Sequence, residues 1–376
     1  MTAVADRVRD ARAAKRRLRV AGAGTWLDAG RPVAASETLS LADDRGIVEY
    51  VPGDLTLTAR AGTRLADIVA ATGAEGQWLP LDPWGGDAGT LGATLSTATA
   101  GPHAYSMGLP RDVVLGMEFV SGAGDVIQAG GRVVKNVAGF DLTRMMIGSW
   151  GTLGVITEAT VRLRARPERT ASLAIAVSST HAALNDIATK LRALPFAALA
   201  SEIVNGRLAS LLGLGEQAVL IARVGGNEKS VQAQLEALRG LGDAREADES
   251  VWTALRTAAP QHASVWRWSQ LPSLFGETWN AADRATRALG SSGVMMHGSP
   301  MRGVARVIAT DTSKVNDAEL TRAAANFSGT VNIESLPSSA WAHLGFTIAS
   351  DPLSHSLRRT FNPGGTLNAG ILGADE

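Results

Sequence analysis

The stretch that decides the fold class is residues 85–97, with the sequence GGDAGTLGATLST. Its side chains are small, hydroxylated or absent, apart from one aspartate and two leucines. Glycine at this density indicates backbone that turns through positive φ angles or comes very close to another group. Backbone amides and Ser/Thr hydroxyls can then approach phosphates and a flat ring system without steric penalty. The stretch therefore predicts a surface that binds a phosphate-bearing ligand with a planar ring.

Two further glycine clusters lie at residues 19–25 (RVAGAGT) and 148–157 (GSWGTLGVIT). The first follows a short predicted strand, but it lacks the third glycine, the following helix and the ribose-binding acid of a dinucleotide fingerprint. We therefore reject a Rossmann fold. Either a structural turn or a turn whose amides point at an anion remains open for this cluster. The second cluster lies between an apolar helical run and a strand, and it is longer than a simple connection requires.

The composition is that of an ordinary globular protein with balanced charge. The 376 residues, 45% of them hydrophobic, predict two or three lobes. A formal net charge of zero removes the electrostatic argument for nucleic acid binding. The chain contains no cysteine, so it cannot itself carry a disulfide, a thiolate nucleophile or a cysteine-ligated iron–sulfur cluster. The N-terminus lacks the apolar core of a signal peptide, and no stretch is apolar enough for a transmembrane segment, so we expect a cytoplasmic protein.

The two halves of the chain differ in their pattern of predicted secondary structure. The first half predicts strands at 17–21, 46–51, 55–61 and 154–164, a helix at 64–71 and a hairpin formed by 113–120 and 126–129. After Pro167 strands and amphipathic helices alternate, which predicts an independent α+β lobe. Its predicted strands are 172–177, 218–224 and 303–309, and its predicted helices are 181–194, 230–241 and 317–326. Residues 266–268 (WRW) predict a strand with both indole rings on one face, which lies against either a core or another subunit.

Seven motifs occur in order along the chain and are followed by a glycine-rich tail. They are Arg19 with 22–25 (GAGT), 80–83 (PLDP), 89–92 (GTLG), 101–102 (GP), 111–116 (RDVVLG), 135–142 (KNVAGFDL) and 148–157 (GSWGTLGVIT), and the tail is 361–370 (FNPGGTLNAG). This ordered set resembles the FAD domain of the vanillyl-alcohol-oxidase-like, PCMH-type flavoproteins. Residues 131–142 are most similar to the E subunits of glycolate oxidases. The motif agreement covers residues 17–167 and 357–372, whereas the middle of the chain agrees only in texture.

The resemblance implies an α+β fold with three parts. A two-lobed PCMH-type FAD-binding domain is expected at residues 1–167. An α+β cap domain, which contacts substrate or another subunit, is expected at residues 168–345. Residues 346–376 are expected to return to the flavin domain, as the C-terminal segment of the family does.

The resemblance also implies a set of cofactor-binding residues. The backbone of Gly22, Ala23, Gly24 and Thr25 would bind the pyrophosphate, and Pro80, Leu91, Gly92, Thr94, Ser96 and Thr97, with Gly101 nearby, would line the flavin and its ribityl chain. Gly151, Gly154, Val155 and Ile156 would hold the adenine side and the ring through backbone contacts. Thr25 stands where some members of the family attach FAD through a histidine, and the chain has no cysteine. We therefore expect non-covalent FAD.

The catalytic residues stay unassigned at this level. Relatives that oxidise 2-hydroxy acids carry a metal-binding His-x-His, but none of the six histidines here forms that pattern, so no metal is predicted. His103 is the histidine of most interest, because it lies among the flavin motifs. Arg111, Lys135 and Arg144 would lie near the flavin lobe, although ion pairs or surface positions explain them equally simply. Trp84 and Trp150 either stack on the flavin or pack in the core.

The function implied by the resemblance is that of an FAD-binding subunit in a glycolate oxidase-like (2-hydroxy-acid:acceptor) complex. A small 2-hydroxy acid such as glycolate would give a hydride to the flavin. A sister flavin subunit and an iron–sulfur subunit would be the partners, and they could hold the protein at the inner membrane. One alternative is a self-sufficient FAD-dependent oxidoreductase acting on another alcohol. The other is a non-catalytic scaffold with a vestigial flavin site, against which the small residues Gly92, Ala93 and Gly154 argue.

Overall fold

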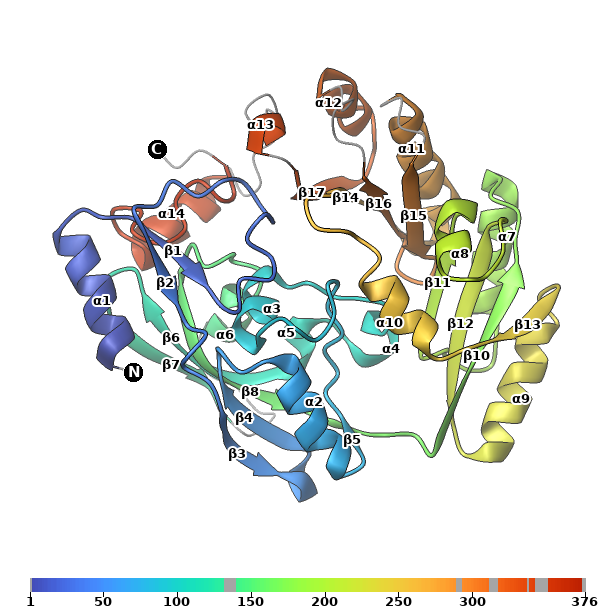
Figure 1. Cartoon of the computed structure of the whole chain (residues 1–376), viewed down its shortest axis with the longest axis horizontal. Coiled ribbons are helices and arrows are strands. Elements are labelled where there is room, and N and C mark those ends of the chain that lie inside the picture. Colours follow the sequence, from blue (N-terminus) through green and yellow to red (C-terminus); the bar gives the residue numbers. More distant parts are fainter. Residues whose placement is uncertain are drawn as a thin grey trace.

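The computed structural model describes residues 2–131, 140–288, 293–310, 317–336, 338–341 and 351–373. Within these ranges the chain forms a mixed α+β fold around two main sheets, as predicted. A five-stranded sheet in the N-terminal part has the order β3-β4-β8-β6-β7, and an eight-stranded sheet in the C-terminal part has the order β13-β10-β12-β11-β15-β16-β14-β17. Figure 1 shows the first sheet at the lower left and the second at the upper right.

The N-terminal sheet is antiparallel throughout. Its strands are β3 (Ile47–Val51), β4 (Thr56–Arg60), β6 (Val114–Ser121), β7 (Val126–Gly130) and β8 (Gly154–Arg162). The predicted hairpin of β6 and β7 is confirmed. Two small sheets accompany it, namely the parallel pair β1 (Leu18–Ala21) and β2 (Glu37–Ser40), and the antiparallel pair β5 (Gln77–Trp78) and β9 (Arg164–Ala165).

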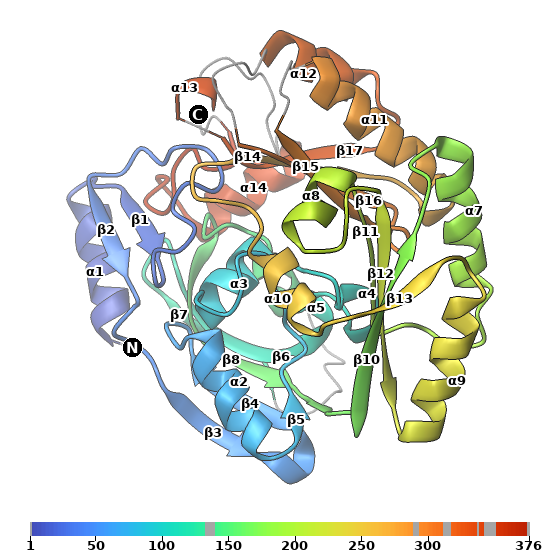
Figure 2. The same ribbon diagram turned by 45° about the vertical axis from the view of Figure 1, so that its right-hand side comes forward.

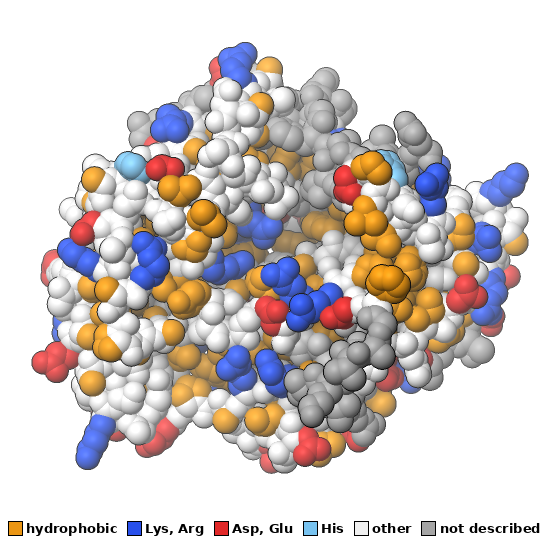
Figure 3. Space-filling view, turned by 180° about the vertical axis from the view of Figure 1, so that it is seen from behind, with side chains coloured by type: hydrophobic (Ala, Val, Ile, Leu, Met, Phe, Trp, Pro, Cys, Tyr) orange, Lys and Arg blue, Asp and Glu red, His pale blue; other side chains and the backbone are white. Residues whose placement is uncertain are grey.

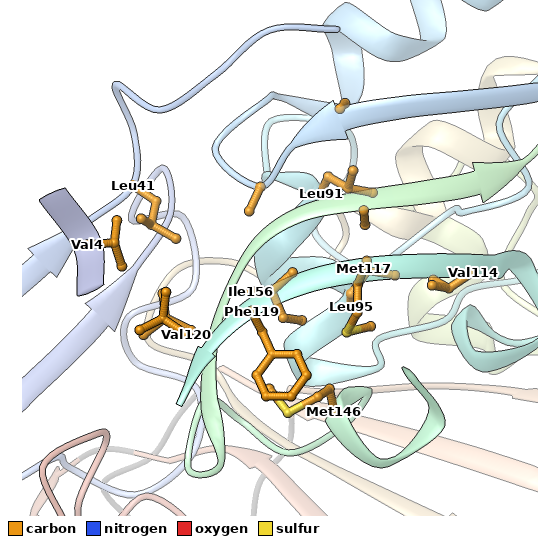
Figure 4. Packing of buried hydrophobic residues seen from close by; sticks show 14 of the residues in the cluster. Val4, Leu41, Leu91, Leu95, Val114, Met117, Phe119, Val120, Met146 and Ile156 are labelled. Atoms are coloured by element: carbon orange, nitrogen blue, oxygen red, sulfur yellow. The ribbon is translucent and has the colours of Figure 1, made fainter. Parts of the chain in front are cut away.

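The helices of this part are mostly short, and three of them, at residues 91–97, 104–107 and 110–113, were not predicted. They are α1 (Thr2–Ala13), α2 (Leu65–Ala74), α3 (Leu91–Thr97), α4 (Ala104–Met107), α5 (Pro110–Val113) and α6 (Leu142–Met146). The second half of the 85–97 stretch forms helix α3, and the Thr90 hydroxyl caps it by accepting from the Ala93 amide. Leu91 and Leu95 lie one turn apart and are fully buried in the same core as Phe119, as Figure 4 shows. This burial stabilises a helix that the composition alone does not favour.

The C-terminal part confirms the predicted alternation. Its strands are β10 (Arg169–Ala176), β11 (Ala200–Val204), β12 (Val219–Gly226), β13 (Ala244–Ala247), β14 (Ser264–Ser269), β15 (Val294–Ser299), β16 (Val304–Ala309) and β17 (Thr330–Ser335). Its helices are α7 (His181–Arg192), α8 (Gly206–Leu211), α9 (Glu228–Arg239), α10 (Ser250–Arg256), α11 (Phe275–Ala288), α12 (Asp317–Ala325) and α13 (Ser338–Trp341). The rings of Trp266 and Trp268 are fully buried together with Phe275 of α11, so that face of β14 belongs to a core.

The two faces of the eight-stranded sheet have different neighbours. Helices α7, α9 and α11 cover the outer face, whereas α8 and α10 lie on the inner face, toward the N-terminal part (Figure 2). Trp84 from the N-terminal part packs into the core of this inner face. The chain then returns through α14 (Pro352–Phe361), and Leu367 pairs with Leu18 of β1. The inner face of the sheet is thereby placed over the loops that follow β1.

Candidate functional site

The three glycine clusters border a single pocket. It lies between the loop after β1, helix α3, the turn before β8 and the returning C-terminus. Ten of the predicted cofactor-binding residues line it, namely Gly22, Ala23, Gly24, Thr25, Gly92, Ser96, Thr97, Gly151, Gly154 and Ile156. The other lining residues include Arg19, Trp26, Ala61, Thr90, Trp150, Asn368 and Ile371. Segments separated by more than 300 residues in the sequence therefore form one site.

The remaining five predicted residues lie beside the pocket rather than on its wall. Leu91 and Val155 are fully buried in the core of the N-terminal part. Thr94 is buried, and its hydroxyl donates to the Thr90 carbonyl at 3.0 Å instead of facing a ligand. Pro80 and Gly101 are buried, and Gly101 packs against Asp82, since a Cβ on Gly101 would meet the Asp82 carbonyl oxygen at 2.2 Å. Their contact with a cofactor stays a prediction.

The loop after β1 presents unpaired backbone donors to the pocket. Within the described residues, the amides of Gly22, Ala23, Gly24 and Thr25 donate to no acceptor. Gly24 has a φ of +76°, a conformation that glycine adopts without strain. Consecutive free amides at a glycine turn form a concave site for an anion such as a pyrophosphate. Of the two possibilities that the sequence left open for this loop, the geometry favours the anion-binding turn.

Close packing around the pocket explains why its residues are small. A Cβ on Gly22 would lie 2.2 Å from the Thr90 hydroxyl, and a Cβ on Gly92 would lie 2.7 Å from the Ala61 methyl. Gly151 has a φ of +69°, and a Cβ there would lie 2.6 Å from the Asn368 amide nitrogen. Glycine therefore stands at positions of the pocket wall where a larger side chain would collide with the neighbouring residues.

Two tryptophans form an aromatic wall of the pocket. The rings of Trp26 and Trp150 are stacked, with centroids 6.4 Å apart and an angle of 14° between their planes. Trp150 has a φ of +54°, which is unusual for a bulky residue and marks a backbone position that the surrounding structure imposes. Trp84, the other tryptophan singled out above, contacts His297 and Arg306 of the eight-stranded sheet instead. The sequence left stacking on the flavin and core packing both open for Trp150, and it did not single out Trp26.

His103 belongs to a polar chain between the two parts of the molecule. Its Nδ1 lies 2.7 Å from Asp82, and its Nε2 lies 3.0 Å from the Arg223 guanidinium. Arg223 in turn pairs with Glu249 at 2.6 Å. This chain of contacts ties the N-terminal part to β12 and to the residue before α10, so His103 has a structural explanation that does not require a ligand.

The basic residues of the flavin motifs lie at the surface where they are described. Arg144 is exposed and pairs with Asp141 at 3.2 Å, and Asp141 also caps helix α6. Arg111 is exposed and lies 4.0 Å from Asp112. Lys135 and most of the 131–142 motif lie outside the described residues. The view from behind in Figure 3 shows acidic and basic side chains interspersed among the described residues, in keeping with the balanced net charge.

A second group of polar residues lies on the inner face of the eight-stranded sheet. His297 of β15 lies opposite Arg306 of β16 in the strand register, and its Nδ1 is 3.0 Å from the Glu202 carboxyl of β11. Arg306 donates to Glu334 of β17 at 2.7 Å. No sequence pattern indicates this group, because its members come from four strands and only antiparallel pairing brings them together.

Burial changes the protonation of this group. It raises the pKa of Glu202 to about 8, against the opposing effect of the Arg302 guanidinium. Burial also lowers the pKa of His297 well below its ordinary value, and Arg306 adds to that effect. At Glu334 burial works to raise the pKa, but Arg306 and Arg267 together outweigh it and lower the pKa. Near neutral pH burial thus favours the uncharged form of both partners, a protonated Glu202 beside a neutral His297.

Two negative observations concern the described residues only. No group of three or more histidines, cysteines or acidic residues among them is arranged to hold a metal ion. None of the helices within the described ranges has the length and apolar character needed to cross a membrane.

Solved structures show which fold this arrangement belongs to. The chain is similar to 4-ethylphenol oxidase from Gulosibacter chungangensis, with a TM-score of 0.75 and 16% identity over 99% of this chain and 87% of that one. It is also similar to alkyldihydroxyacetonephosphate synthase, with a TM-score of 0.68 and 15% identity over 97% of this chain and 74% of that one. At these identities the likeness concerns the fold alone.

Sequence comparisons place the chain in a family. Residues 1–130 match the FAD binding domain family. The chain is 36% identical to glycolate oxidase subunit GlcE of Escherichia coli K12 over 255 residues, which are 68% of this chain and 67% of that protein. It is 37% identical to glycolate oxidase subunit GlcD of Bacillus subtilis over 148 residues, which are 39% of this chain and only 32% of that protein. The chain therefore belongs to the family of FAD-dependent oxidoreductases that includes the glycolate oxidase subunit GlcE, and its cofactor is FAD.

Proposed function

We propose that this protein is the FAD-binding subunit of a glycolate oxidase-like complex that oxidises a small 2-hydroxy acid such as glycolate. The observation that carries the proposal is the convergence of residues 22–25, 92–97 and 151–156 on one pocket, with the free amides of 22–25 along its edge. The similarity to GlcE over two thirds of both chains supports the same assignment. We further propose the domain bounds given above, with residues 168–345 as the cap.

The residues of the pocket fit FAD in their chemistry. The free amides of the 22–25 loop suit the pyrophosphate, because backbone N–H groups bind anions without a charged side chain. The hydroxyls of Ser96 and Thr97 suit the ribityl chain, and the wall of Trp26 and Trp150 suits a planar ring. Neither a cysteine nor a histidine lines this pocket among the described residues, which favours non-covalent binding.

In the mechanism, bound FAD supplies the hydride acceptor, and the protein supplies position and electrostatics. The glycine turns hold the pyrophosphate end through their amides, and the small residues of α3 allow close approach of the cofactor. The returning C-terminus closes the pocket with Asn368 and Ile371 and limits the access of water. The chain has no cysteine for iron–sulfur ligation, so we propose that electrons leave through a separate subunit and that a sister flavin subunit completes the complex.

The test is spectroscopic first and enzymatic second. The protein is purified alone, its visible spectrum is recorded with and without added FAD, and glycolate is then added without oxygen. We expect a dissociable flavin spectrum and no bleaching by glycolate until the partner subunits are co-expressed. A colourless protein that ignores FAD would favour the scaffold alternative, and bleaching of the isolated protein by glycolate or another alcohol would favour the self-sufficient enzyme.

A further inference from the structure

The inner face of the eight-stranded sheet carries more positive than negative charge in a confined space. Three guanidinium groups meet there, those of Arg267 on β14, Arg302 in the β15–β16 turn and Arg306 on β16. Arg306 is buried, and the other two are partly buried. The carboxylates close to them are Glu334 and, in the loop below, Asp82. The remaining acid, Glu202, adds no negative charge near neutral pH because burial raises its pKa to about 8.

Arg302 has no partner among the described residues. No hydrogen bond or ion pair within those residues involves its guanidinium, although Glu202, Arg267 and Asp82 are near enough to shift its pKa. By contrast, Arg306 and Arg267 both reach Glu334, at 2.7 Å and 3.9 Å. A partly buried guanidinium costs folding free energy unless an anion pairs with it. One positive charge on this face is therefore left for an anion to balance.

Three buried polar atoms around the same place also lack partners. They are Nε2 of His297, Oγ of Ser299 and Nε of Arg267. His297 and Ser299 alternate along β15 and so lie on the same face of the sheet, while Glu202 occupies Nδ1 of His297 from the other side. Buried polar atoms without partners are rare in folded proteins and indicate a missing water or ligand. Water can satisfy the hydrogen bonds but cannot balance the charge.

We propose that this face, formed by Arg302, His297 and Ser299 with Arg267 and Arg306 beside them, is a binding site for a small carboxylate. Arg302 pairs with the carboxylate, and the Ser299 hydroxyl and the ring of His297 donate to its oxygens. In this proposal protonated Glu202 donates to Nδ1 of His297, which leaves the ring proton on Nε2, the nitrogen without a partner among the described residues. The Glu202–His297 pair thus acts as a fixed donor, in a place where a metal site is absent from the described residues.

The site lies against the wall of the flavin pocket. Gly30 donates its amide to the Glu334 carbonyl at 2.9 Å, and Ala29 forms a bridge with Ser335. Ala29 itself lines the pocket. If the proposed function is correct, a 2-hydroxy acid held here by its carboxylate lies on the cap side of the flavin. The assignment of the ligand as the substrate rests on the proposed function, whereas the carboxylate site itself does not.

The experiment is calorimetric titration of the FAD-loaded protein with sodium acetate, sodium glycolate and sodium chloride at constant ionic strength. We expect one acetate or glycolate per chain and no competition by chloride at equal concentration. Arg302→Met should weaken carboxylate binding by about 10- to 100-fold, since it removes a charge-assisted hydrogen bond. The carboxylate affinity of Arg302→Lys should lie between those of the wild type and Arg302→Met, because lysine keeps the charge but not the paired donors. Tighter binding of glycolate than of acetate would show that the site also recognises the 2-hydroxyl group.

Arg239→Met is the matched control, because Arg239 lies on the exposed side of α9 and pairs only with Glu246 at 3.6 Å. Its carboxylate affinity should equal that of the wild type. The proposal is overturned if Arg302→Met binds acetate as tightly as the wild type, or if chloride binds as tightly as acetate. The visible spectrum of each variant shows whether the flavin pocket is intact. Should the protein fail to bind FAD at all, the proposed function fails, and the same titration without FAD still tests the carboxylate site.

Discussion

The side chain of Asn368 joins the turn at Trp150 to the first strand of the chain. Its Nδ2 donates to the Trp150 carbonyl at 2.7 Å, and its Oδ1 accepts from the Val20 amide at 2.8 Å. The backbone amide of Asn368 also donates to the Leu18 carbonyl at 2.9 Å. A single C-terminal residue thus connects two walls of the flavin pocket that are 130 residues apart in the sequence. The tail resemblance predicted that this segment returns to the flavin, but not which contacts it makes.

Substitution Asn368→Ala should destabilise the protein and weaken FAD binding together. It leaves the partly buried Val20 amide and Trp150 carbonyl without their partners, which costs about 1–3 kcal/mol. Urea unfolding and the FAD dissociation constant measure the two effects. Asn326→Ala, at an exposed position after α12, is the control and should change neither quantity. Unaltered FAD affinity in Asn368→Ala would show that the tail does not shape the pocket.

Substitution Gly151→Ala should cost more than an alanine in a left-handed turn normally does. The positive φ alone costs about 1 kcal/mol, and the new Cβ would also lie 2.6 Å from the Asn368 amide nitrogen. Gly213→Ala is a matched control, because Gly213 has a similar φ of +72° and no atom within 4 Å of the added Cβ. We expect a larger fall in melting temperature and a loss of bound flavin for Gly151→Ala only. If the two substitutions lower the melting temperature and the bound flavin equally, the close contact between position 151 and Asn368 does not contribute to either effect.

Substitution Trp26→Leu should weaken FAD binding without unfolding the protein. Trp26 is partly exposed and stacks with Trp150, so its loss removes an aromatic surface of the pocket worth about 1–3 kcal/mol if a ring of the cofactor lies on it. The FAD dissociation constant from flavin fluorescence should rise by about 5- to 100-fold. Trp279→Phe, in the core on the outer face of the second sheet, should keep the wild-type affinity. If Trp26→Leu also binds FAD with the wild-type affinity, the aromatic wall does not contact the cofactor.

The raised pKa of Glu202 predicts a stability that falls with pH. The folded-state pKa of about 8 exceeds the ordinary value of 4.5, so between these values the folded state holds a proton that the unfolded state has lost. The free energy of unfolding should therefore decrease as pH rises, by at most about 1.4 kcal/mol per unit, until Glu202 ionises. The groups facing it are His297, Arg302, Arg306 and Asp82.

The useful window for this measurement is pH 6.5 to 8.5. The lowered pKa of His297 makes the free energy of unfolding rise with pH, but only below pH 6.5, the ordinary pKa of histidine. Above pH 6.5 this contribution no longer changes with pH. Urea unfolding across the window should show a flatter pH dependence for Glu202→Gln than for the wild type, since glutamine does not titrate. Glu236→Gln, at an exposed position of α9, should reproduce the wild-type slope. The same slope in all three proteins would contradict a buried, protonated Glu202.

Much of the fold could be predicted because local sequence patterns carry it. The strand at residues 55–61 and the hairpin of β6 and β7 depend on contacts with near neighbours, and both predictions are confirmed. Helix α3 could not be predicted, because its stability comes from burying Leu91 and Leu95 in a core built by distant strands. The resemblance implied that Thr94 lines the flavin, which stays a prediction, but no sequence pattern showed that helix α3 directs the Thr94 hydroxyl onto the Thr90 carbonyl.

By itself the sequence predicted a phosphate-bearing ligand with a planar ring, because glycine-rich turns bind phosphates through backbone groups whose positions follow from local conformation. The resemblance of the ordered motifs to a flavoprotein family implied that this ligand is FAD. The tertiary structure alone decided which side chains surround that cofactor and what charge they carry. Asn368 reaches Trp150 only when the tail pairs beside β1, and Arg302 is left with an unbalanced charge only when Glu202 is buried and protonated. Both depend on burial and on the register of strands far apart in the chain, which short-range patterns do not encode.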